Sequence, residues 1–74
     1  MIYEWLNREK SRYYKVAVRK LGTNSIVLHH DWGSCISNRK GKKDLVVHTE
    51  DDAQNLIEKM MKRRKSRGYE LVAP

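Results

Sequence analysis

The sequence predicts an α+β fold, in which a small antiparallel sheet of about five strands packs against one amphipathic helix. Three observations predict it: apolar and polar residues alternate in the first half, an apolar stripe with helical spacing covers residues 53–61, and a short apolar segment follows that stripe. The 74 residues are enough for a single domain spanning 1–74 and too few for a second independent core.

The first half of the chain predicts three strands joined by short turns. Residues 2–8 predict the first strand, and residues 9–11 the turn that follows it. Alternation of apolar and polar side chains then predicts strands over 12–20 and 25–32. The turn between these two contains Gly22, which can adopt the positive φ that a tight turn requires. The two strands therefore form an antiparallel hairpin.

The second half predicts a loop, a strand, the helix and a last short strand. Residues 33–43 are polar and rich in glycine and serine, which is typical of a loop, and residues 45–47 are an apolar run. Thr49 followed by three acids predicts a helix start, because a hydroxyl caps free N–H groups and acids suit the positive end of the helix dipole. Gly68 predicts the helix end, and residues 69–72 return as a strand.

Basic charge dominates the chain and is unevenly distributed. The sequence holds 16 Lys and Arg against 9 Asp and Glu, which gives a net charge of +7. Residues 39–43 carry four positive charges and residues 59–67 carry six, whereas residues 44–58 carry five acids and no base. This balance indicates a polyanionic partner, with nucleic acid as the first candidate and an anionic membrane surface as the second.

The sequence also indicates a compartment. No stretch approaches the ~20 apolar residues that cross a bilayer, and the first residues lack the basic flank and apolar run of a signal peptide. Cys35 is the only cysteine, so an internal disulfide is excluded and a reducing environment is favoured. We therefore expect a cytoplasmic protein.

Trp32 has two interpretations, and both stay open at this stage. It ends a predicted strand immediately before a polar loop, where it could close the edge of the core. Alternatively, it could lie at the lip of a basic surface and stack on a base or a ribose. Trp5, Tyr13 and Tyr14 share this ambiguity, although Tyr14 is in phase with the apolar face of its strand.

The sequence gives little indication of metal binding or catalysis. Adjacent His29 and His30 point to opposite faces of a strand, so only one of them could share a site with His48. No CxxC or HxxxH spacing accompanies them. No orienting residue or oxyanion device accompanies Cys35. We therefore expect no metal site, no cofactor, no catalytic residue and no enzymatic activity.

Four features follow one another along the chain: Tyr-Tyr-Lys-Val at 13–16, Trp-Gly at 32–33, an acidic helix start with Ala53, and a basic helix end leading to Gly-Tyr at 68–69. Their order and spacing resemble those of WGR domains, a family named for a Trp-Gly-Arg motif. The family occurs in poly(ADP-ribose) polymerases and in many bacterial proteins. The resemblance covers about residues 10–72.

The resemblance implies a small antiparallel sheet with one helix, and contact with DNA near a strand break rather than catalysis. In the polymerases the motif tryptophan packs at a terminal nucleotide and basic residues contact the backbone. By this resemblance, Trp32 is the stacking residue and Gly33 allows the nucleic acid to approach closely.

Two positions depart from the family pattern. Ser34 stands where the motif has arginine, and Ile36 replaces a second family glycine. Because the family's arginine makes backbone or interdomain contacts, we expect Arg39 and Lys40 to supply the missing charge from the loop.

The sequence therefore predicts a stand-alone WGR-like module that binds double-stranded DNA or DNA ends with low sequence specificity and does not bind membranes. The residues expected to contact nucleic acid are Trp32, Gly33, Arg39, Lys40, Lys42, Lys43, Arg63, Lys65 and Arg67. The alternative is a protein-interaction adaptor with only weak, nonspecific DNA binding, in which the acidic helix start or an exposed face of Trp32 binds a partner protein.

Overall fold

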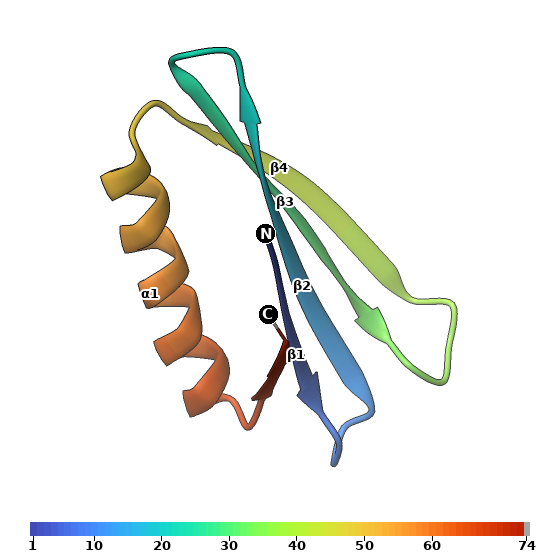
Figure 1. The fold of residues 1–74 in the computed structure, drawn as a ribbon. Helices are drawn as coiled ribbons and strands as arrows, with labels where there is room; N and C mark the ends of the chain where they lie inside the picture. The colour runs from blue at the N-terminus through green and yellow to red at the C-terminus, as the bar shows by residue number, and fades with distance from the viewer. Residues whose placement is uncertain (74) are drawn as a thin grey trace.

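A five-stranded antiparallel sheet carries one helix on one of its faces in the computed structural model, which describes residues 1–73 (Figure 1). The predicted α+β fold is thereby confirmed. The strands lie in the order β4-β3-β2-β1-β5. The elements are β1 (Ile2–Asn7), β2 (Arg12–Leu21), β3 (Ser25–Ser34), β4 (Lys40–Val47), α1 (Glu50–Ser66) and β5 (Glu70–Ala73). In this described part of the chain, no helix is long and apolar enough to cross a membrane.

The central hairpin of β2 and β3 sets the register of the sheet. Its ladder runs from Arg12 opposite Ser34 to Leu21 opposite Ser25, with Val16 opposite His30 near the middle. Paired residues share a face, and the faces alternate along each strand. The row that contains Val16 therefore faces α1, and every second row faces away from it.

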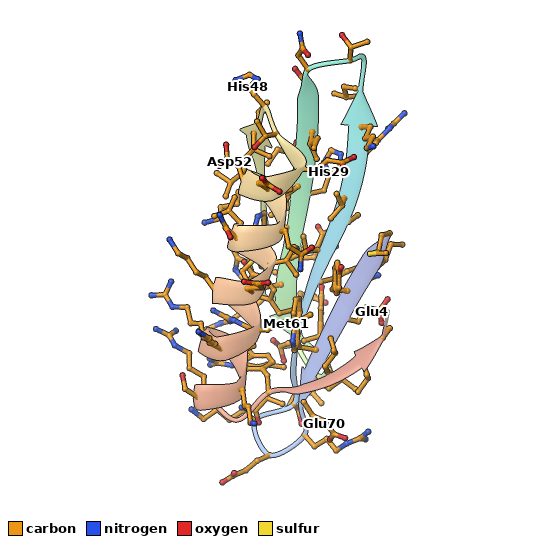
Figure 2. The ribbon with its side chains drawn as sticks, turned by 60° about the vertical axis from the view of Figure 1, so that its left-hand side comes forward. Glu4, His29, His48, Asp52, Met61 and Glu70 are labelled. Carbon is orange, nitrogen blue, oxygen red and sulfur yellow. The ribbon has the colours of Figure 1, made fainter. Side chains whose placement is uncertain are left out.

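The core lies between this inner face and the first half of the helix. Trp5, Val16 and Leu28 are the largest fully buried side chains. Ala53 and Ile57 from α1 pack against them, as the apolar stripe predicts. Figure 2 shows Met61 of the same stripe on the side of α1 that faces the sheet.

Both ends of the helix follow the predicted capping pattern. The hydroxyl of Thr49 accepts a hydrogen bond from the N–H of Asp52 at 3.1 Å. At the other end Gly68 has a φ of +85°, its N–H donates to the carbonyl of Lys65, and the N–H of Tyr69 donates to the carbonyl of Arg64. These two bonds form a Schellman motif, which turns the chain sharply into β5.

The loop between β3 and β4 is shorter than the sequence predicted. We expected a flexible polar loop over 33–43, whereas the loop spans only residues 35–39. Residues on either side continue the β3–β4 ladder, with Gly33 opposite Lys40. Lysines are tolerated there because β4 is an edge strand, where charged side chains discourage pairing with other chains. The basic residues of β4 therefore have fixed, alternating directions.

Candidate nucleic-acid interface

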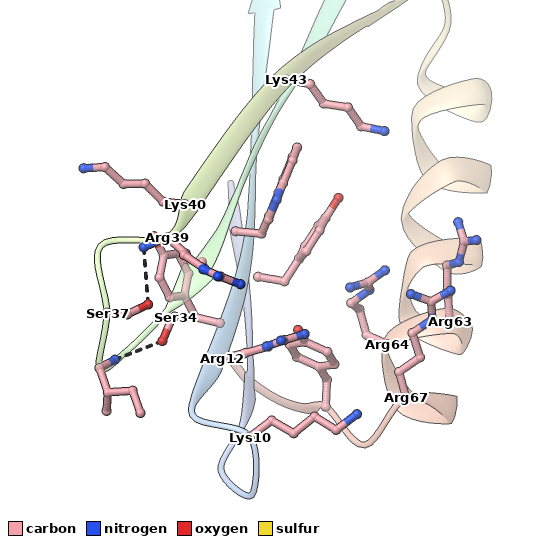
Figure 3. A pocket seen from close by; sticks show the side chains of 16 residues that line it. Lys10, Arg12, Ser34, Ser37, Arg39, Lys40, Lys43, Arg63, Arg64 and Arg67 are labelled. Carbon is pink, nitrogen blue, oxygen red and sulfur yellow. Dashed lines mark hydrogen bonds between the residues drawn. The ribbon is translucent and has the colours of Figure 1, made fainter.

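A groove separates the second half of α1 from the end of β3 and the start of β4 (Figure 3). Its volume is about 780 Å³. Eight basic side chains line it, and no acidic residue does. They are Lys10, Arg12, Arg39, Lys40, Lys43, Arg63, Arg64 and Arg67. Such a concentration of one charge in a concave site strengthens the local potential for an anion.

Aromatic rings form the floor of this groove. Tyr14 and Trp32 are cross-strand neighbours, and their rings stack with centroids 5.9 Å apart and an interplanar angle of 11°. On the other side of Trp32, a Cβ atom on Gly41 would lie 2.6 Å from the indole. Gly41 therefore leaves the space that the ring occupies, and Trp32 is held half-buried between β2 and β4.

Arg64 covers this floor from the helix side. Its guanidinium lies 4.3 Å from the centroid of the Tyr14 ring and 5.2 Å from that of Tyr69. The Schellman motif explains the second contact, because it brings Tyr69 back against the last turn of the helix. The Nε atom of Arg64 is buried without a hydrogen-bond partner. The side chain is thus held by cation–π contacts and not by an acid.

A partly buried hydrogen bond to His30 fixes the hydroxyl of Tyr14. Its hydroxyl and Nδ1 of His30 are 2.8 Å apart, and His30 is only 3% exposed. Burial raises the pKa of Tyr14, against the opposing effect of Arg64. Burial, and then the ammonium of Lys43, lowers the pKa of His30, so that its neutral form is favoured. The Nε2 atom of His30 has no partner in either tautomer.

At the lower end of the groove, Asn7 joins the end of α1 to the β1–β2 turn. Its side-chain amide donates to the carbonyl of Arg67 at 3.1 Å, and its side-chain carbonyl accepts from the N–H of Lys10 at 2.9 Å. Asn7 is 4% exposed, so its end of each bond is buried, and both bonds are partly shielded from water. The β1–β2 turn and the end of α1 are thereby held together, which places Lys10 and Arg67 beside one opening.

The β3–β4 loop forms the opposite wall and is held by backbone hydrogen bonds, one of them to the β1–β2 turn. The N–H of Ser34 donates to the carbonyl of Arg39 at 2.9 Å, and that of Cys35 donates to the carbonyl of Ser11 at 2.7 Å. The hydroxyl of Ser34, at the position of the motif arginine, accepts from the N–H of Ile36 (Figure 3). This side chain therefore shapes the loop.

The structure brings seven of the nine predicted residues to the groove and leaves two outside it. Lys42 lies opposite Asp31 on the face of the sheet that points away from α1. Lys65 is exposed on the helix and does not line the groove. The predicted residues at the groove are Trp32, Gly33, Arg39, Lys40, Lys43, Arg63 and Arg67.

Two of these seven are placed differently from the expectation. A Cβ on Gly33 would lie 2.9 Å from the hydroxyl of Tyr13, so the missing side chain gives room to a neighbouring ring. Lys40 is at the rim, and its side chain points away from the groove in Figure 3.

Sequence reasoning missed several residues of the groove, above all Arg12, Arg64 and Tyr69. Two of them carry a signal. Arg64 continues the apolar helical stripe, three residues after Met61, so it faces the sheet. Arg12 is two residues before Tyr14 and shares its face. The packing of Tyr69 depends on the turn after the helix and has no such signal.

The opposite face of the sheet has mixed charge. The ammonium of Lys15 is 3.5 Å from the carboxylate of Glu4, and Nδ1 of His29 is 2.7 Å from that of Asp44. At the start of α1, Lys20 pairs with Glu50, which lowers the pKa of that carboxyl group. Neither region concentrates positive charge as the groove does.

Among residues 1–73, no three side chains of the metal-binding types lie together. Cys35 is exposed on the β3–β4 loop and is not disulfide-bonded. The groove itself is lined by lysines, arginines, aromatic rings and serines, together with Gly33 and Ile36. Its chemistry is therefore that of an anion-binding surface.

Comparison of the chain with family models, with curated proteins and with solved structures gave no match.

Proposed function

We propose that this chain is a nucleic-acid-binding module, and that it binds DNA duplexes or DNA ends with low sequence specificity through the basic groove. The observation that carries the proposal is the joint presence of eight basic side chains and a stacked Tyr14–Trp32 floor in one acid-free groove. Basic side chains neutralise phosphates, and the exposed parts of the half-buried rings can contact a sugar or a base. The resemblance to WGR domains, which rests on sequence, supports the same function.

The basic walls account for affinity. Lys and Arg side chains neutralise phosphates and release their counterions, which supplies most of the free energy of nonspecific binding. In Figure 3, Arg63, Arg64 and Arg67 come from the helix, whereas Arg39 comes from the opposite wall. A backbone in the groove would therefore be contacted from two sides.

Low specificity follows from what these walls contain. Reading of base edges in the major groove uses Asn, Gln and Arg side chains on an element that enters that groove. The residues of α1 that line the groove are arginines only, and the exposed Gln54 and Asn55 lie nearer the acidic start of the helix, outside the groove. We therefore expect binding to depend on charge and strand ends rather than on base order.

Salt dependence tests this mechanism. Fluorescence anisotropy with a labelled DNA duplex, repeated over a series of salt concentrations, gives the slope of log affinity against log salt. Neutralisation of about four to six phosphates predicts a slope of roughly −4 to −5. A slope near zero would contradict the electrostatic mechanism, and absence of binding at low salt would contradict the function.

A protein-interaction adaptor is the second candidate, because the face of the sheet opposite α1 is uncovered and carries exposed apolar side chains (Figure 1). Val46 on this face is 57% exposed, and Ile2 and Leu21 are 48% exposed. Such side chains can contact a partner protein. Under this alternative, DNA binding is weak and vanishes at moderate salt.

A further inference from the structure

We propose that Ile36, in the β3–β4 loop, is an apolar wedge that enters the minor groove of a bound duplex, unstacks one base step and bends the DNA. This inference rests on the proposed function, because it specifies how a duplex is held at the same basic surface. It follows from three observations: the exposure of Ile36, the hydrogen bonds that fix its loop, and the charges around it.

Ile36 is the most exposed large apolar side chain in residues 1–73. It is 82% exposed, and of the eight such side chains that are exposed in this part of the chain it alone lines the basic groove. Single exposed apolar residues are common on protein surfaces, but this one lies within the candidate interface. Contact with a bound duplex would remove its surface from water, which the hydrophobic effect favours.

Hydrogen bonds hold the backbone of Ile36 in place. The N–H of Ser34 donates to the carbonyl of Arg39 at 2.9 Å and closes the loop, while the N–H of Cys35 donates to the carbonyl of Ser11 at 2.7 Å. The N–H of Ile36 itself donates to the hydroxyl of Ser34 at 3.2 Å (Figure 3). A side chain on an ordered backbone loses less conformational entropy when it inserts into a partner.

Basic side chains lie close to Ile36 along the chain and across the groove wall. Arg39 is in the same loop, and Lys10 and Arg12 flank the residue to which the loop is bonded; all three line the groove. Proteins that kink DNA combine such phosphate contacts with an apolar side chain inserted between base pairs from the minor groove. The bend allows further phosphate contacts, which offset the cost of unstacking one step.

Insertion from the minor groove agrees with the low sequence specificity proposed above. The base edges in the minor groove distinguish A·T from G·C pairs and little else. A wedge responds to how easily a base step unstacks, which depends on the flexibility of the DNA. We therefore expect a preference for flexible or mismatched steps within an otherwise nonspecific interaction.

An exposed isoleucine among basic residues can also contact a lipid surface, but the loop fits a membrane less well. The other residues of the loop are Cys35, Ser37, Asn38 and Arg39, so it has no second large apolar side chain. Membrane binding scales with the apolar area that is buried in the lipid. One isoleucine offers little area to a membrane, whereas a single apolar side chain is enough to separate two base pairs.

Resonance energy transfer between dyes at the two ends of a duplex of about 20–30 base pairs tests the inference. The wild-type protein should bend this duplex by roughly 40° or more and bring the dyes closer. We expect Ile36→Ala to leave the bound duplex straight and to bind roughly three- to tenfold more weakly, whereas Ile36→Leu keeps the bend. Ile2→Ala, which shortens an isoleucine that is 48% exposed outside the groove, is the matched control and should bend DNA as the wild type does. Unfolding curves establish that the variants are folded.

A duplex with one mismatched base pair at its centre gives a second readout. Because a mismatched step unstacks more easily, the wild type should bind this duplex roughly three- to tenfold more tightly than the matched one, and Ile36→Ala should bind the two equally. Bound DNA that stays straight with the wild type, or that Ile36→Ala bends equally, would overturn the wedge and leave the proposed function intact. If neither duplex is bound at low salt, the proposed function itself fails.

Discussion

The two halves of the interface between helix and sheet involve the same helix and sheet but differ in what fills the space between them. Along its first half α1 packs buried apolar side chains such as Ala53 and Ile57 into the core cluster that contains Leu28. Along its second half the helix presents arginines, and the ends of β3 and β4 lie away from it (Figure 1). The first half stabilises the fold, and the second half is open to a ligand.

The difference shows how one amphipathic helix can serve both purposes. The stripe that faces the sheet is apolar up to Met61 and then continues with Arg64. A long basic side chain cannot be buried as Ile57 is, and the guanidinium of Arg64 instead lies over the rings of Tyr14 and Tyr69. Cation–π contacts then replace apolar packing as the link between the helix and Tyr14.

The largest expected effect on stability belongs to the packed half. Leu28 is 0% exposed, so Leu28→Ala should lower the free energy of unfolding by about 2–5 kcal/mol, through lost burial and the cavity left behind. Arg63→Ala in the groove should change it by less than about 0.5 kcal/mol while weakening DNA binding. Urea denaturation measures both, and similar losses in the two variants would remove the distinction between the halves.

A smaller effect is expected where the floor of the groove meets the sheet. A Cβ at Gly41 would lie 2.6 Å from the Trp32 ring, so Gly41→Ala should displace the indole at a cost of about 1–3 kcal/mol. Trp32 fluorescence should change at the same time, and binding should weaken. Lys42→Ala, one residue on and on the other face, is the control. An unaltered emission spectrum in Gly41→Ala would contradict the close contact.

The smallest expected effect concerns pH. Burial lowers the pKa of His30 in the folded state. As the pH falls below about 6.5, His30 is therefore protonated more readily in the unfolded chain than in the folded one. Stability from this group is therefore present above that pH and decreases below it. Lys43 and Arg64 act in the same direction, whereas Asp44 and Asp31 oppose it.

Thermal unfolding at about pH 7.5 and about pH 5.5 measures this dependence. The midpoint of the wild-type protein should fall on acidification, and that of His30→Gln should fall less. His29→Gln, which removes the exposed partner of Asp44, is the control and should keep the contribution of His30. The same decrease in His30→Gln as in the wild type would show that another group causes it.

The sequence predicted the fold because its patterns are local. Alternation in the hairpin and the stripe over 53–61 each depend on a few neighbouring residues, and so do the caps at Thr49 and Gly68. The extent of β4 was not predicted, because its lysines and Gly41 are typical of a loop and only pairing with β3 makes them a strand.

The candidate site was predicted only in part, because some of its features are local in the sequence and others depend on strand register and long-range contacts. Charge density along the chain indicated Arg39, Lys43 and the basic end of the helix. It could not show that Lys42 points to the other face of the sheet, since that depends on the register of β4 with β3. The contact of Arg64 with Tyr14 joins distant segments, and no local pattern reveals it.

The central claim is that the groove, and not positive charge in general, binds nucleic acid. Two double variants with the same net charge test it most directly: Arg12→Glu with Arg63→Glu in the groove, and Lys15→Glu with Lys42→Glu on the opposite face. Measured by anisotropy with one DNA ligand at one salt concentration, the groove variant should lose at least about tenfold in affinity. The variant of the opposite face should stay within about threefold of the wild type. Equal losses in the two variants would contradict the account.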